Sequence, residues 1–350
     1  MELLTLRARP VGPGYPPYII AEIGSNHNGD MKLCRRLVDA AKDAGADAVK
    51  FQSWSKSSLI SKAEYARHPE YSDKKRHFGS LEEMVEAYQF TPAQHREIAA
   101  HCKGSGIEFL SSVFSPEEVD LLESLDVPAH KIASMDVTHH PLLKYVAQTG
   151  KPVMLSTGMA TLAEVAEAVD ILQDSGAGPL ALLHCVALYP PEHKDVHLLN
   201  ILTLRQTFDC VSGFSDHTSG TSIALAAIAL GASVVEKHFT LDKEMEGWDH
   251  WISADPAELA AIVREGQVIF DALGSTLRTV SEGELRKRLL FRRCIVARRA
   301  LPKGHLIAET DLDYKRPGTG IGPNEARYVV GRTLAVGVEE DHEFSWPDFL

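Results

Sequence analysis

The sequence predicts an α/β protein in which a parallel (β/α)8 barrel is followed by a smaller, β-rich domain. Two observations predict the barrel: eight short apolar runs follow one another along the first part of the chain, and segments with helix start and stop signals separate them. A third observation, the end of this alternation near Gly274, predicts the second domain. A length of 350 residues allows two domains at most.

Composition and charge exclude several classes of protein. The chain is 44% hydrophobic and 24% charged, and no run approaches the roughly 20 apolar residues that a membrane span needs. Its 36 Lys and Arg against 48 Asp and Glu give a net charge of −12, which argues against nucleic-acid binding. The N-terminus has no signal pattern, and the five scattered cysteines match neither a disulfide nor a zinc pattern. We therefore expect a cytoplasmic protein with reduced thiols and no membrane partner.

The eight runs are β-branched or apolar and do not alternate with polar residues, which is typical of parallel strands that are buried on both faces. They are Tyr18–Ile23, Ala48–Gln52, Glu108–Val113, Lys131–Ser134, Pro152–Ser156, Leu180–Cys185, Val211–Phe214 and Val234–His238. Eight strands over roughly 270 residues match the count and size of a TIM barrel. A doubly wound open sheet is the alternative, but no G-x-G-x-x-G follows the first strand.

Capping residues mark where the intervening helices begin. The capping-box pattern occurs at Ser80–Glu83, Ser115–Glu118 and Thr161–Glu164, with close variants at Thr91–Gln94 and Asp255–Glu258. The helix expected at Met31–Ala44 carries Leu33, Leu37 and Ala41 on one face and is followed by Gly45, a helix stop signal.

The chain after Gly274 changes character. The basic stretch Glu284–Arg299 indicates a solvated linker leading into a first strand, in preference to a phosphate or nucleic-acid patch. Strand-like pieces follow at Cys294–Ala297 and Val329–Val336. The expected domains are a barrel at 1–275, a linker at 276–291 and a compact β-rich domain at 292–350.

Polar side chains lie at or just beyond the carboxyl ends of the predicted strands, which form the active-site face of a barrel. These residues are Glu22, Lys50, Gln52, Ser111, Ser112, Lys131, Ser134, Asp136, Ser156, Tyr189, Ser215, His217, Glu236 and His238. Alternation with period two places Lys50 with Gln52, and likewise Ser215 with His217 and Glu236 with His238, on one face. The strand ends therefore predict one convergent polar site.

His217 and His238 end two adjacent strands, so their imidazoles can share one divalent metal and leave coordination positions open for a substrate. The remaining ligands would be water and substrate oxygens, or Asp216 or Glu236, which favours Mn²⁺ or Mg²⁺ over structural zinc. The alternative is that each histidine is a hydrogen-bonded structural residue.

Lys50 and Lys131, with serine hydroxyls around them, predict an anion site, because a lysine in a barrel mouth is costly unless it meets an anion. The alternative is internal pairing, for example of Lys50 with Glu22. A Lewis-acid metal beside a phosphate or carboxylate pocket indicates an enzyme that joins a phosphorylated reagent to a carbonyl compound.

Short motifs follow one another along the whole chain. In the barrel they are Ala21–Gly29, Lys50-Phe-Gln52, Lys131-Ile-Ala-Ser134, Ser156-Thr-Gly-Met159, Leu183-His-Cys185 with Tyr189-Pro190, Ser215-Asp-His-Thr218 and Glu236-Lys-His-Phe-Thr240. In the tail they are Ser281-Glu-Gly-Glu284, Arg292-Arg293 and Lys315-Arg-Pro-Gly-Thr-Gly320. Taken in this order, the motifs resemble the sialic acid (N-acetylneuraminate) synthase family with its C-terminal SAF domain (antifreeze-like, β-clip).

The resemblance implies a phosphoenolpyruvate-dependent aldol-type synthase that makes a nine-carbon 2-keto-3-deoxy sugar acid. The acceptor would be N-acetylmannosamine or a di-N-acetylated or deoxy relative. His217 and His238 would hold the metal, Mn²⁺ or else Mg²⁺ or Co²⁺. The phosphate and carboxylate of phosphoenolpyruvate would bind to Lys131, Ser134, Ser156, Ser215 and either Ser111 or Ser112.

The remaining roles follow from the same resemblance. Glu22, Gln52 and Asp249 would bind sugar hydroxyls, Lys50 would lie at the mouth, and Asp136 or Glu22 would handle the proton of the attacking water. Tyr189 and Glu236 are the other expected site residues. Arg316 would come from the SAF domain of a second subunit, so that the site is completed in a domain-swapped homodimer.

Three positions depart from the family pattern and leave the acceptor sugar open. Asp136 replaces the usual Glu, and Ala187 stands where a member of the family has Asn. Gly247-Trp-Asp-His250 replaces Gly-Pro-Asp-His and puts Trp248 beside Asp249, with Trp251 nearby. The indole either stacks on an acetamido or deoxy-sugar face or packs the loop. A 6-phosphorylated sugar, or a legionaminate- or pseudaminate-type sugar, is therefore an alternative acceptor.

Other classes of protein fit less well. An amidohydrolase-type metal enzyme needs His-x-His at the end of the first strand, where this chain has Gly24-Ser-Asn-His-Asn-Gly29. A non-catalytic carbohydrate-binding protein would not need Lys131 and the serines, and it would release no phosphate. Octulosonate- and heptulosonate-phosphate synthases lack the C-terminal module and require a phosphorylated aldose.

Overall fold

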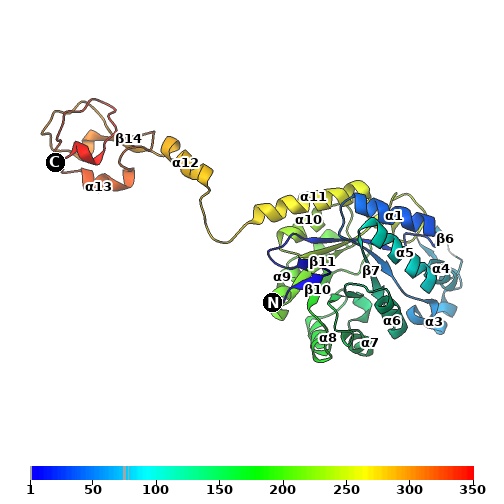
Figure 1. Cartoon of the computed structure of the whole chain (residues 1–350). Coiled ribbons are helices and arrows are strands. Elements are labelled where there is room, and N and C mark those ends of the chain that lie inside the picture. Colours follow the sequence, from blue (N-terminus) through cyan, green and yellow to red (C-terminus); the bar gives the residue numbers. More distant parts are fainter. Residues whose placement is uncertain (1, 74–75, 78) are drawn as a thin grey trace. The chain divides into compact units, whose positions relative to one another are not determined.

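Parallel strands close into a ring in the computed structural model of the chain, which describes residues 2–73, 76–77 and 79–350 (Figure 1). The strands of the ring are β3 (Tyr18–Gly24), β4 (Ala48–Gln52), β7 (Glu108–Val113), β8 (His130–Ile132), β9 (Val153–Ser156), β10 (Leu180–Cys185), β11 (Val211–Asp216) and β12 (Val234–His238). They pair in the order β10-β11-β12-β3-β4-β7-β8-β9, and β9 pairs with β10. The predicted eight-stranded TIM barrel is confirmed.

A helix follows each barrel strand before the next one begins, and these helices surround the ring (Figure 1). They are α1 (Met31–Asp43), α5 (Pro92–Ser105), α6 (Pro116–Ser124), α7 (His140–Ala147), α8 (Leu162–Asp174), α9 (Asn200–Phe208), α10 (Ser222–Ala229) and α11 (Pro256–Leu273). The predicted capping boxes form at α5, α8 and α11. The one predicted at Ser115 does not form, because the Glu118 carboxylate accepts from the Phe114 N–H and the Ser58 hydroxyl.

The connection between β4 and β7 holds more structure than the sequence analysis expected. It contains α2 (Lys56–Leu59), α3 (Lys62–Arg67), the antiparallel pair β5 (Ser72–Asp73) and β6 (Arg76–His77), and α4 (Leu81–Tyr88). The capping box predicted at Ser80 opens α4. Trp54, Tyr65, Met84 and Phe114 pack together here in a cluster of their own. The insertion therefore adds an aromatic wall at the carboxyl end of the barrel.

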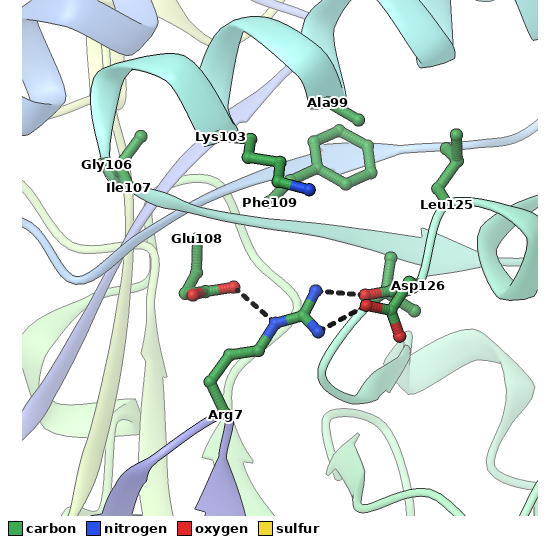
Figure 2. Close-up of a pocket in the computed structure, with 10 residues that line it drawn as sticks. Arg7, Ala99, Lys103, Gly106, Ile107, Glu108, Phe109, Leu125 and Asp126 are labelled. Atoms are coloured by element: carbon green, nitrogen blue, oxygen red, sulfur yellow. Dashed lines mark hydrogen bonds and ion pairs between the residues drawn. The ribbon is translucent and has the colours of Figure 1, made fainter.

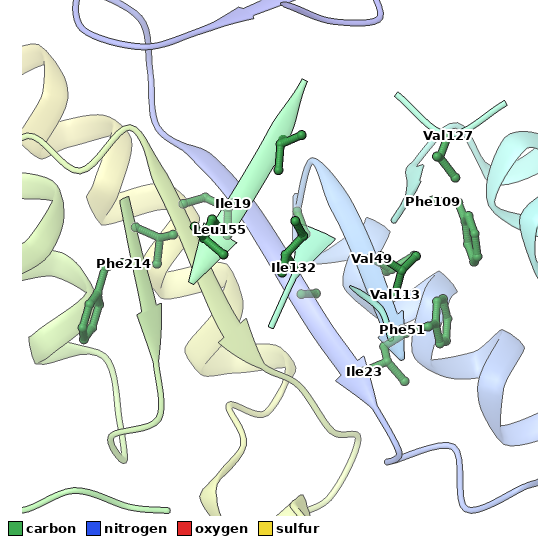
Figure 3. Packing of buried hydrophobic residues seen from close by; sticks show 14 of the residues in the cluster. Ile19, Ile23, Val49, Phe51, Phe109, Val113, Val127, Ile132, Leu155 and Phe214 are labelled. Atoms are coloured by element: carbon green, nitrogen blue, oxygen red, sulfur yellow. The ribbon is translucent and has the colours of Figure 1, made fainter. Parts of the chain in front are cut away.

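Alternation along each strand sorts the side chains into two layers. Ile19 and Ile23 of β3 and Val49 and Phe51 of β4 belong to the apolar layer shared with the surrounding helices (Figure 3). Tyr18 and Ile20 belong instead to the cluster inside the ring. Because successive strand side chains point to opposite faces, a residue between two outward ones points inward. The inward positions nearest the carboxyl ends are polar.

The amino-terminal end of the ring is closed by a hairpin of β1 (Leu4–Leu6) and β2 (Arg9–Val11). Its apolar side chains join the cluster inside the ring. Arg7, in the hairpin turn, places its guanidinium between Glu108 and Asp126, with Nη1 2.6 Å from Asp126 Oδ2, beside a cavity of about 490 Å³ (Figure 2). With the interior filled from this side, the open end of the barrel is the one at the carboxyl ends of the strands.

The chain divides into two compact units, Met1–Gly274 and Ser275–Leu350. In the second unit β13 (Cys294–Ala297) pairs antiparallel with β14 (Leu312–Lys315), followed by α13 (Ala326–Val329). Its core contains Ile295, Leu312, Leu334, Phe344 and other apolar side chains. The unit therefore has a hydrophobic core of its own, separate from that of the barrel.

The sequence prediction is incomplete in one detail and wrong in two others. Part of the expected linker at 276–291 is a helix, α12 (Glu282–Phe291), which begins at a capping box between Ser281 and Glu284. The strand expected at 329–336 is the end of α13 and a turn at Gly331, where φ is 85°, followed by isolated β-bridges at Thr333 and Leu334. The strand expected at 131–134 ends at Ile132, and the chain continues as a 3₁₀ turn. None of the helices in the described residues is long and apolar enough to cross a bilayer.

Candidate active site

A cavity of about 530 Å³ opens at the carboxyl ends of the barrel strands. Thirteen of the residues singled out from the sequence line it: Glu22, Lys50, Gln52, Ser112, Lys131, Ser134, Ser156, Tyr189, Ser215, His217, Glu236, His238 and Asp249. The strand ends therefore bring together side chains that are up to 227 positions apart along the chain, from Glu22 to Asp249.

Glu236 of β12 lies at the centre of the cavity floor. Its Oε2 is 3.9 Å from the Nζ of Lys50 and 3.9 Å from the Nζ of Lys131, and its Oε1 accepts a hydrogen bond of 2.9 Å from Ser215. Lys131 also donates to Ser156 Oγ at 2.7 Å. A carboxylate, two ammonium groups and two hydroxyls thus share one buried space.

Lys50 has a closer carboxylate partner. Its Nζ lies 2.8 Å from Glu22 Oε2 and donates to Ser112 Oγ at 3.0 Å. The internal Lys–Glu pairing weighed as an alternative is therefore present for Lys50. Gln52 donates to the other Glu22 oxygen at 2.9 Å and is itself held by the indole N–H of Trp54. Of the two lysines, Lys131 is the one with no carboxylate closer than 3.9 Å.

Burial and neighbouring charge give the carboxyl groups of Glu22 and Glu236 different pKa values. Burial raises the pKa of Glu22 to about 7, although Lys50 opposes the shift. Burial also disfavours ionised Glu236, but the ammonium groups of Lys131 and Lys50 bring its pKa below the usual value. Two carboxyl groups in one site with divergent pKa values are suited to different roles, one holding a proton near neutral pH and the other remaining charged.

His217 directly follows β11 and His238 ends β12, and their ring centroids are 5.3 Å apart. His217 Nδ1 bonds to the backbone oxygen of Val186 at 2.9 Å, which leaves Nε2 as its free ring nitrogen. His238 Nδ1 is buried without a hydrogen-bond partner, and Asp249 Oδ2 lies 3.7 Å from it. Burial lowers the pKa of His238 well below its usual value, so its imidazole is neutral.

These features fit a divalent metal. A neutral imidazole with an unpartnered nitrogen, beside a second imidazole, offers two nitrogen ligands of the kind that a divalent ion such as Mn²⁺ accepts. Within residues 2–73, 76–77 and 79–350, no group of three or more His, Cys, Asp or Glu side chains is arranged to hold a metal by itself. Such an ion would therefore need water or substrate oxygens to complete its shell.

Tyr189 covers the histidines from one side. Its ring stacks on His217 at a centroid distance of 4.1 Å and meets His238 edge-on at 5.8 Å. On another side, Ser134 Oγ accepts from the backbone N–H of Gly158 at 2.9 Å. The Ser134 hydroxyl also bonds to the thiol of Cys185 at the end of β10.

Two barrel residues singled out from the sequence, Ser111 and Asp136, do not line the cavity, and a third candidate, Arg316, belongs to the second unit. Ser111 points to the outer face of β7, because its neighbours Leu110 and Ser112 point inward, and its hydroxyl lies 2.6 Å from Ser53 Oγ. Asp136 belongs to the 3₁₀ turn Ser134–Asp136, where its Oδ1 is 3.2 Å from His139 Nδ1. Arg316 lies in the second unit, with its guanidinium over the ring of Phe291 at 5.0 Å.

The sequence analysis also missed several lining residues. Cys185 ends β10 with its sulfur 3.9 Å from His217 Nδ1, and the strand-end rule that selected Ser156 would have found it. The cavity is also lined by Tyr71, Phe114, Met135 and Met159. Met135 and Met159 follow strand ends within one turn, but Tyr71 comes from the insertion after β4, where the sequence signal at Ser80 marks α4 and not Tyr71.

Comparison with known proteins places the chain in a family. The model of the NeuB family matches residues 37–278, and the SAF domain model matches residues 292–350. An N,N'-diacetyllegionaminic acid synthase of Legionella pneumophila is 39% identical over 97% of this chain and 96% of the relative. The N-acetylneuraminate-9-phosphate synthase of Homo sapiens is 34% identical over 97% and 95%, respectively.

A solved structure agrees with this placement. The N-acetylneuraminic acid (sialic acid) synthetase of Leptospira borgpetersenii superposes with a TM-score of 0.74 at 33% identity, covering 82% of this chain and 95% of that one. The resemblance drawn from the motifs is thereby confirmed. The two family models and these relatives together show that the chain belongs to the NeuB family, which is of the sialic acid synthase type. The chain ends in a SAF domain.

Proposed function

We propose that this protein condenses phosphoenolpyruvate with the open-chain aldehyde of an N-acetylated hexosamine. The products are a nine-carbon 2-keto-3-deoxy acid and inorganic phosphate. One observation carries the proposal: Lys131 and its serine neighbours form a buried, hydrogen-bonding anion site directly beside two adjacent imidazoles. The relatives are named as synthases of nine-carbon sugar acids, which supports the same reaction class.

Phosphoenolpyruvate binds in this proposal on the Lys131 side of the floor. Lys131 has no carboxylate within a short ion-pair distance, so its charge is available to the phosphate or carboxylate of the substrate. Ser134 and Ser156 supply hydroxyl donors, and Ser112 and Ser215 lie on either side. Ser112 takes the place in this set that the sequence left open between Ser111 and Ser112.

The aldehyde oxygen binds on the side of His217 and His238, which would hold Mn²⁺, or Mg²⁺ or Co²⁺ in its place. Such an ion, when bound, polarises the aldehyde and opposes the negative charge that develops on its oxygen, which is worth several kcal/mol. Tyr189 stacks on His217 and shields this side from water. Gln52 and Asp249, both at the cavity wall, are placed to bind sugar hydroxyls.

The chemistry requires one carbon–carbon bond and one proton transfer in its first step. The C3 carbon of phosphoenolpyruvate attacks the aldehyde carbon, and the aldehyde oxygen takes a proton to become a hydroxyl. Water then adds at C2 and loses one proton. The bond between C2 and the phosphate oxygen breaks as the second proton of that water passes to the departing phosphate, which leaves a ketone at C2. Glu22, with a pKa of about 7, is the group suited to exchange these protons, while charged Glu236 keeps both lysines in place.

Arg316 and a second subunit complete the proposal. Arg316 is exposed just after β14, and the resemblance to the family implies that it would complete the active site of a partner subunit. The proposed assembly is therefore a domain-swapped homodimer in which each SAF domain serves the other barrel.

Phosphate release tests the proposed reaction. Purified protein with Mn²⁺ and phosphoenolpyruvate should release phosphate only when an amino sugar is present, and mass spectrometry should find the nine-carbon acid. Lys131→Met should abolish release, whereas Lys151→Met, which removes a lysine before β9 at the opposite end of the barrel, should not. Sugar binding without any phosphate release would instead indicate a carbohydrate-binding protein.

A further inference from the structure

The side-chain amide of Gln52 connects a buried tryptophan to a carboxyl group of the cavity floor. Its Nε2 donates to Glu22 Oε1 at 2.9 Å, and its Oε1 accepts from Trp54 Nε1 at 2.9 Å. Lys50 Nζ lies 2.8 Å from the other Glu22 oxygen, so both oxygens of this carboxyl group are held. The described residues that line the cavity include Glu22 and Gln52 but not Trp54. Trp54 therefore lies outside the site and is bonded to a residue within it.

The indole of Trp54 decides which end of the Gln52 amide faces Glu22. An amide has a donor end and an acceptor end of nearly the same shape, and a half-turn of the group exchanges them. The indole N–H is a donor only, so it can meet only the carbonyl oxygen of the amide. The NH2 group is then directed at Glu22, which is 1% exposed and needs donors within the protein because water does not reach it.

Packing fixes the indole in turn. Trp54 is 3% exposed and belongs to the aromatic cluster of the insertion, which includes Tyr65. The chain just before it is anchored on the neighbouring strand, because the Ser53 N–H donates to the backbone oxygen of Ser112 at 2.9 Å. The Ser53 hydroxyl also lies 2.8 Å from His95 Nε2. A donor that is held in this way orients the amide before any substrate arrives.

We propose that Trp54 is a positioning residue for Glu22 and acts through the Gln52 amide. This inference rests on the proposed function, in which Glu22 exchanges protons with the aldehyde oxygen and with water. The indole N–H keeps the donor end of the amide toward Glu22, and Gln52 and Lys50 together keep the carboxyl group in one place. Without the indole donor the amide turns, and the carboxyl group loses a fixed partner. Proton transfer requires a group within hydrogen-bond reach of the reacting atom, so the loss falls on turnover.

Two substitutions of Trp54 separate its donor from its packing. Trp54→Phe keeps an aromatic ring in the cluster but removes the N–H. Trp54→His removes most of the ring but keeps an N–H, because imidazole Nε2 takes the place of indole Nε1 in the five-membered ring. At about pH 8, where a histidine is neutral, kcat for phosphate release should fall at least about 10-fold in Trp54→Phe and stay within about 3-fold of wild-type protein in Trp54→His. The melting temperatures should rank in the opposite order, and the KM for phosphoenolpyruvate should stay within about 2-fold in both variants.

A double variant provides the same test without Trp54→His. Gln52→Met removes the amide, so adding Trp54→Phe to it should lower kcat by no more than about 2-fold further. Tyr65→Phe is the matched control, because it removes a hydroxyl of the same cluster that donates to the backbone oxygen of Lys56 at 3.0 Å, and it should leave kcat unchanged.

The outcomes distinguish this inference from the proposed function. Losses that multiply in the double variant, or a higher kcat in Trp54→Phe than in Trp54→His, would show that Trp54 only packs the insertion and would overturn the inference. Either result would leave the reaction class intact. No phosphate release by wild-type protein with any amino sugar would overturn the proposed function instead.

Discussion

At the scale of single residues, the imidazoles of His217 and His238 are the most specific feature of this chain. Sequence distance separates them by one whole βα unit, yet their rings lie 5.3 Å apart at the open end of the barrel. His238 keeps an unpartnered nitrogen in a buried position, which costs stability unless something binds there. This cost is a reason to expect that the pair serves a ligand.

Removing either imidazole should therefore affect both metal binding and turnover. His217→Ala and His238→Ala should each lower turnover at least about 100-fold, because several kcal/mol of transition-state stabilisation depend on the metal. Both variants should also lose Mn²⁺ binding, measured as free Mn²⁺ by electron paramagnetic resonance. His101→Ala, on the outer helix α5, is the control. Near-full activity of wild-type protein in excess chelator would contradict the metal role.

The stability of the second unit should depend on pH through the carboxyl group of Asp311. Burial disfavours its charge, but hydrogen bonds from His305, the Ala308 N–H and Arg299 lower its pKa to about 2, against an ordinary value of 3.8. Because the folded pKa is depressed, its contribution is complete above about pH 4 and is lost as the pH falls toward 2. Asp311→Asn should cost about 2 kcal/mol at neutral pH.

Hydrogen exchange of peptides from β13 and β14 in the full-length protein measures this effect. Protection in Asp311→Asn should be lower than in wild-type protein at pH 6, and the difference should shrink between pH 4 and pH 2. A difference that grows as the pH falls would contradict the assigned pKa.

At the scale of secondary structure elements, a buried ion pair joins β11 to β12 behind the histidines. Lys237 Nζ lies 2.8 Å from Asp216 Oδ2, and both side chains are fully buried. Asp216 precedes His217, and Lys237 precedes His238, so the pair sits at the base of both imidazoles. It therefore couples the stability of the two strand ends to the spacing of the rings.

Breaking this pair on one side should be costly. Asp216→Asn leaves the Lys237 charge buried without its carboxylate and should destabilise the barrel by about 3–5 kcal/mol. The double variant Asp216→Leu with Lys237→Met should recover much of that loss, because it removes both charges. Urea unfolding measures both. A single variant within about 1 kcal/mol of wild-type protein would show that the pair contributes little.

The secondary structure elements also show which parts of the fold the sequence patterns could predict. The runs at β4, β7, β10 and β12 predicted the strands to the residue, because buried parallel strands need continuous apolar runs. The hairpins and α12 were not predicted. The strands of the hairpins are too short to show a periodic pattern of apolar residues. Because α12 has no buried residue, no apolar stripe marks it in the sequence.

At the scale of the whole molecule, the proposed exchange of SAF domains makes a prediction about mixtures. Lys131→Met and Arg316→Ala should each be inactive, since each removes one part of every site. Refolding or co-expressing the two variants together should restore up to about a quarter of wild-type activity. In a swapped dimer, half of the molecules are then mixed, and one site in each keeps both residues.

The control is the same mixture made from two barrel variants, Lys131→Met and His217→Ala, which should stay inactive because both changes fall in the barrel. Activity of Arg316→Ala alone at the wild-type level would contradict a role for Arg316. An absence of recovery, with a monomer by light scattering, would contradict the swapped dimer.

The sequence alone determined the barrel, the polar strand ends and the family, because these depend on local patterns: apolar runs, capping residues and short ordered motifs. It also placed Lys50, Ser215 and Glu236 on inward faces by alternation. The tertiary structure alone decided that Ser112 and not Ser111 faces the cavity, that Asp136 does not line it, that Lys50 pairs with Glu22, and that Tyr71 of the insertion meets Trp248 beside the cavity. These outcomes depend on which side chains meet across strands and loops distant in sequence, and no local pattern records such contacts.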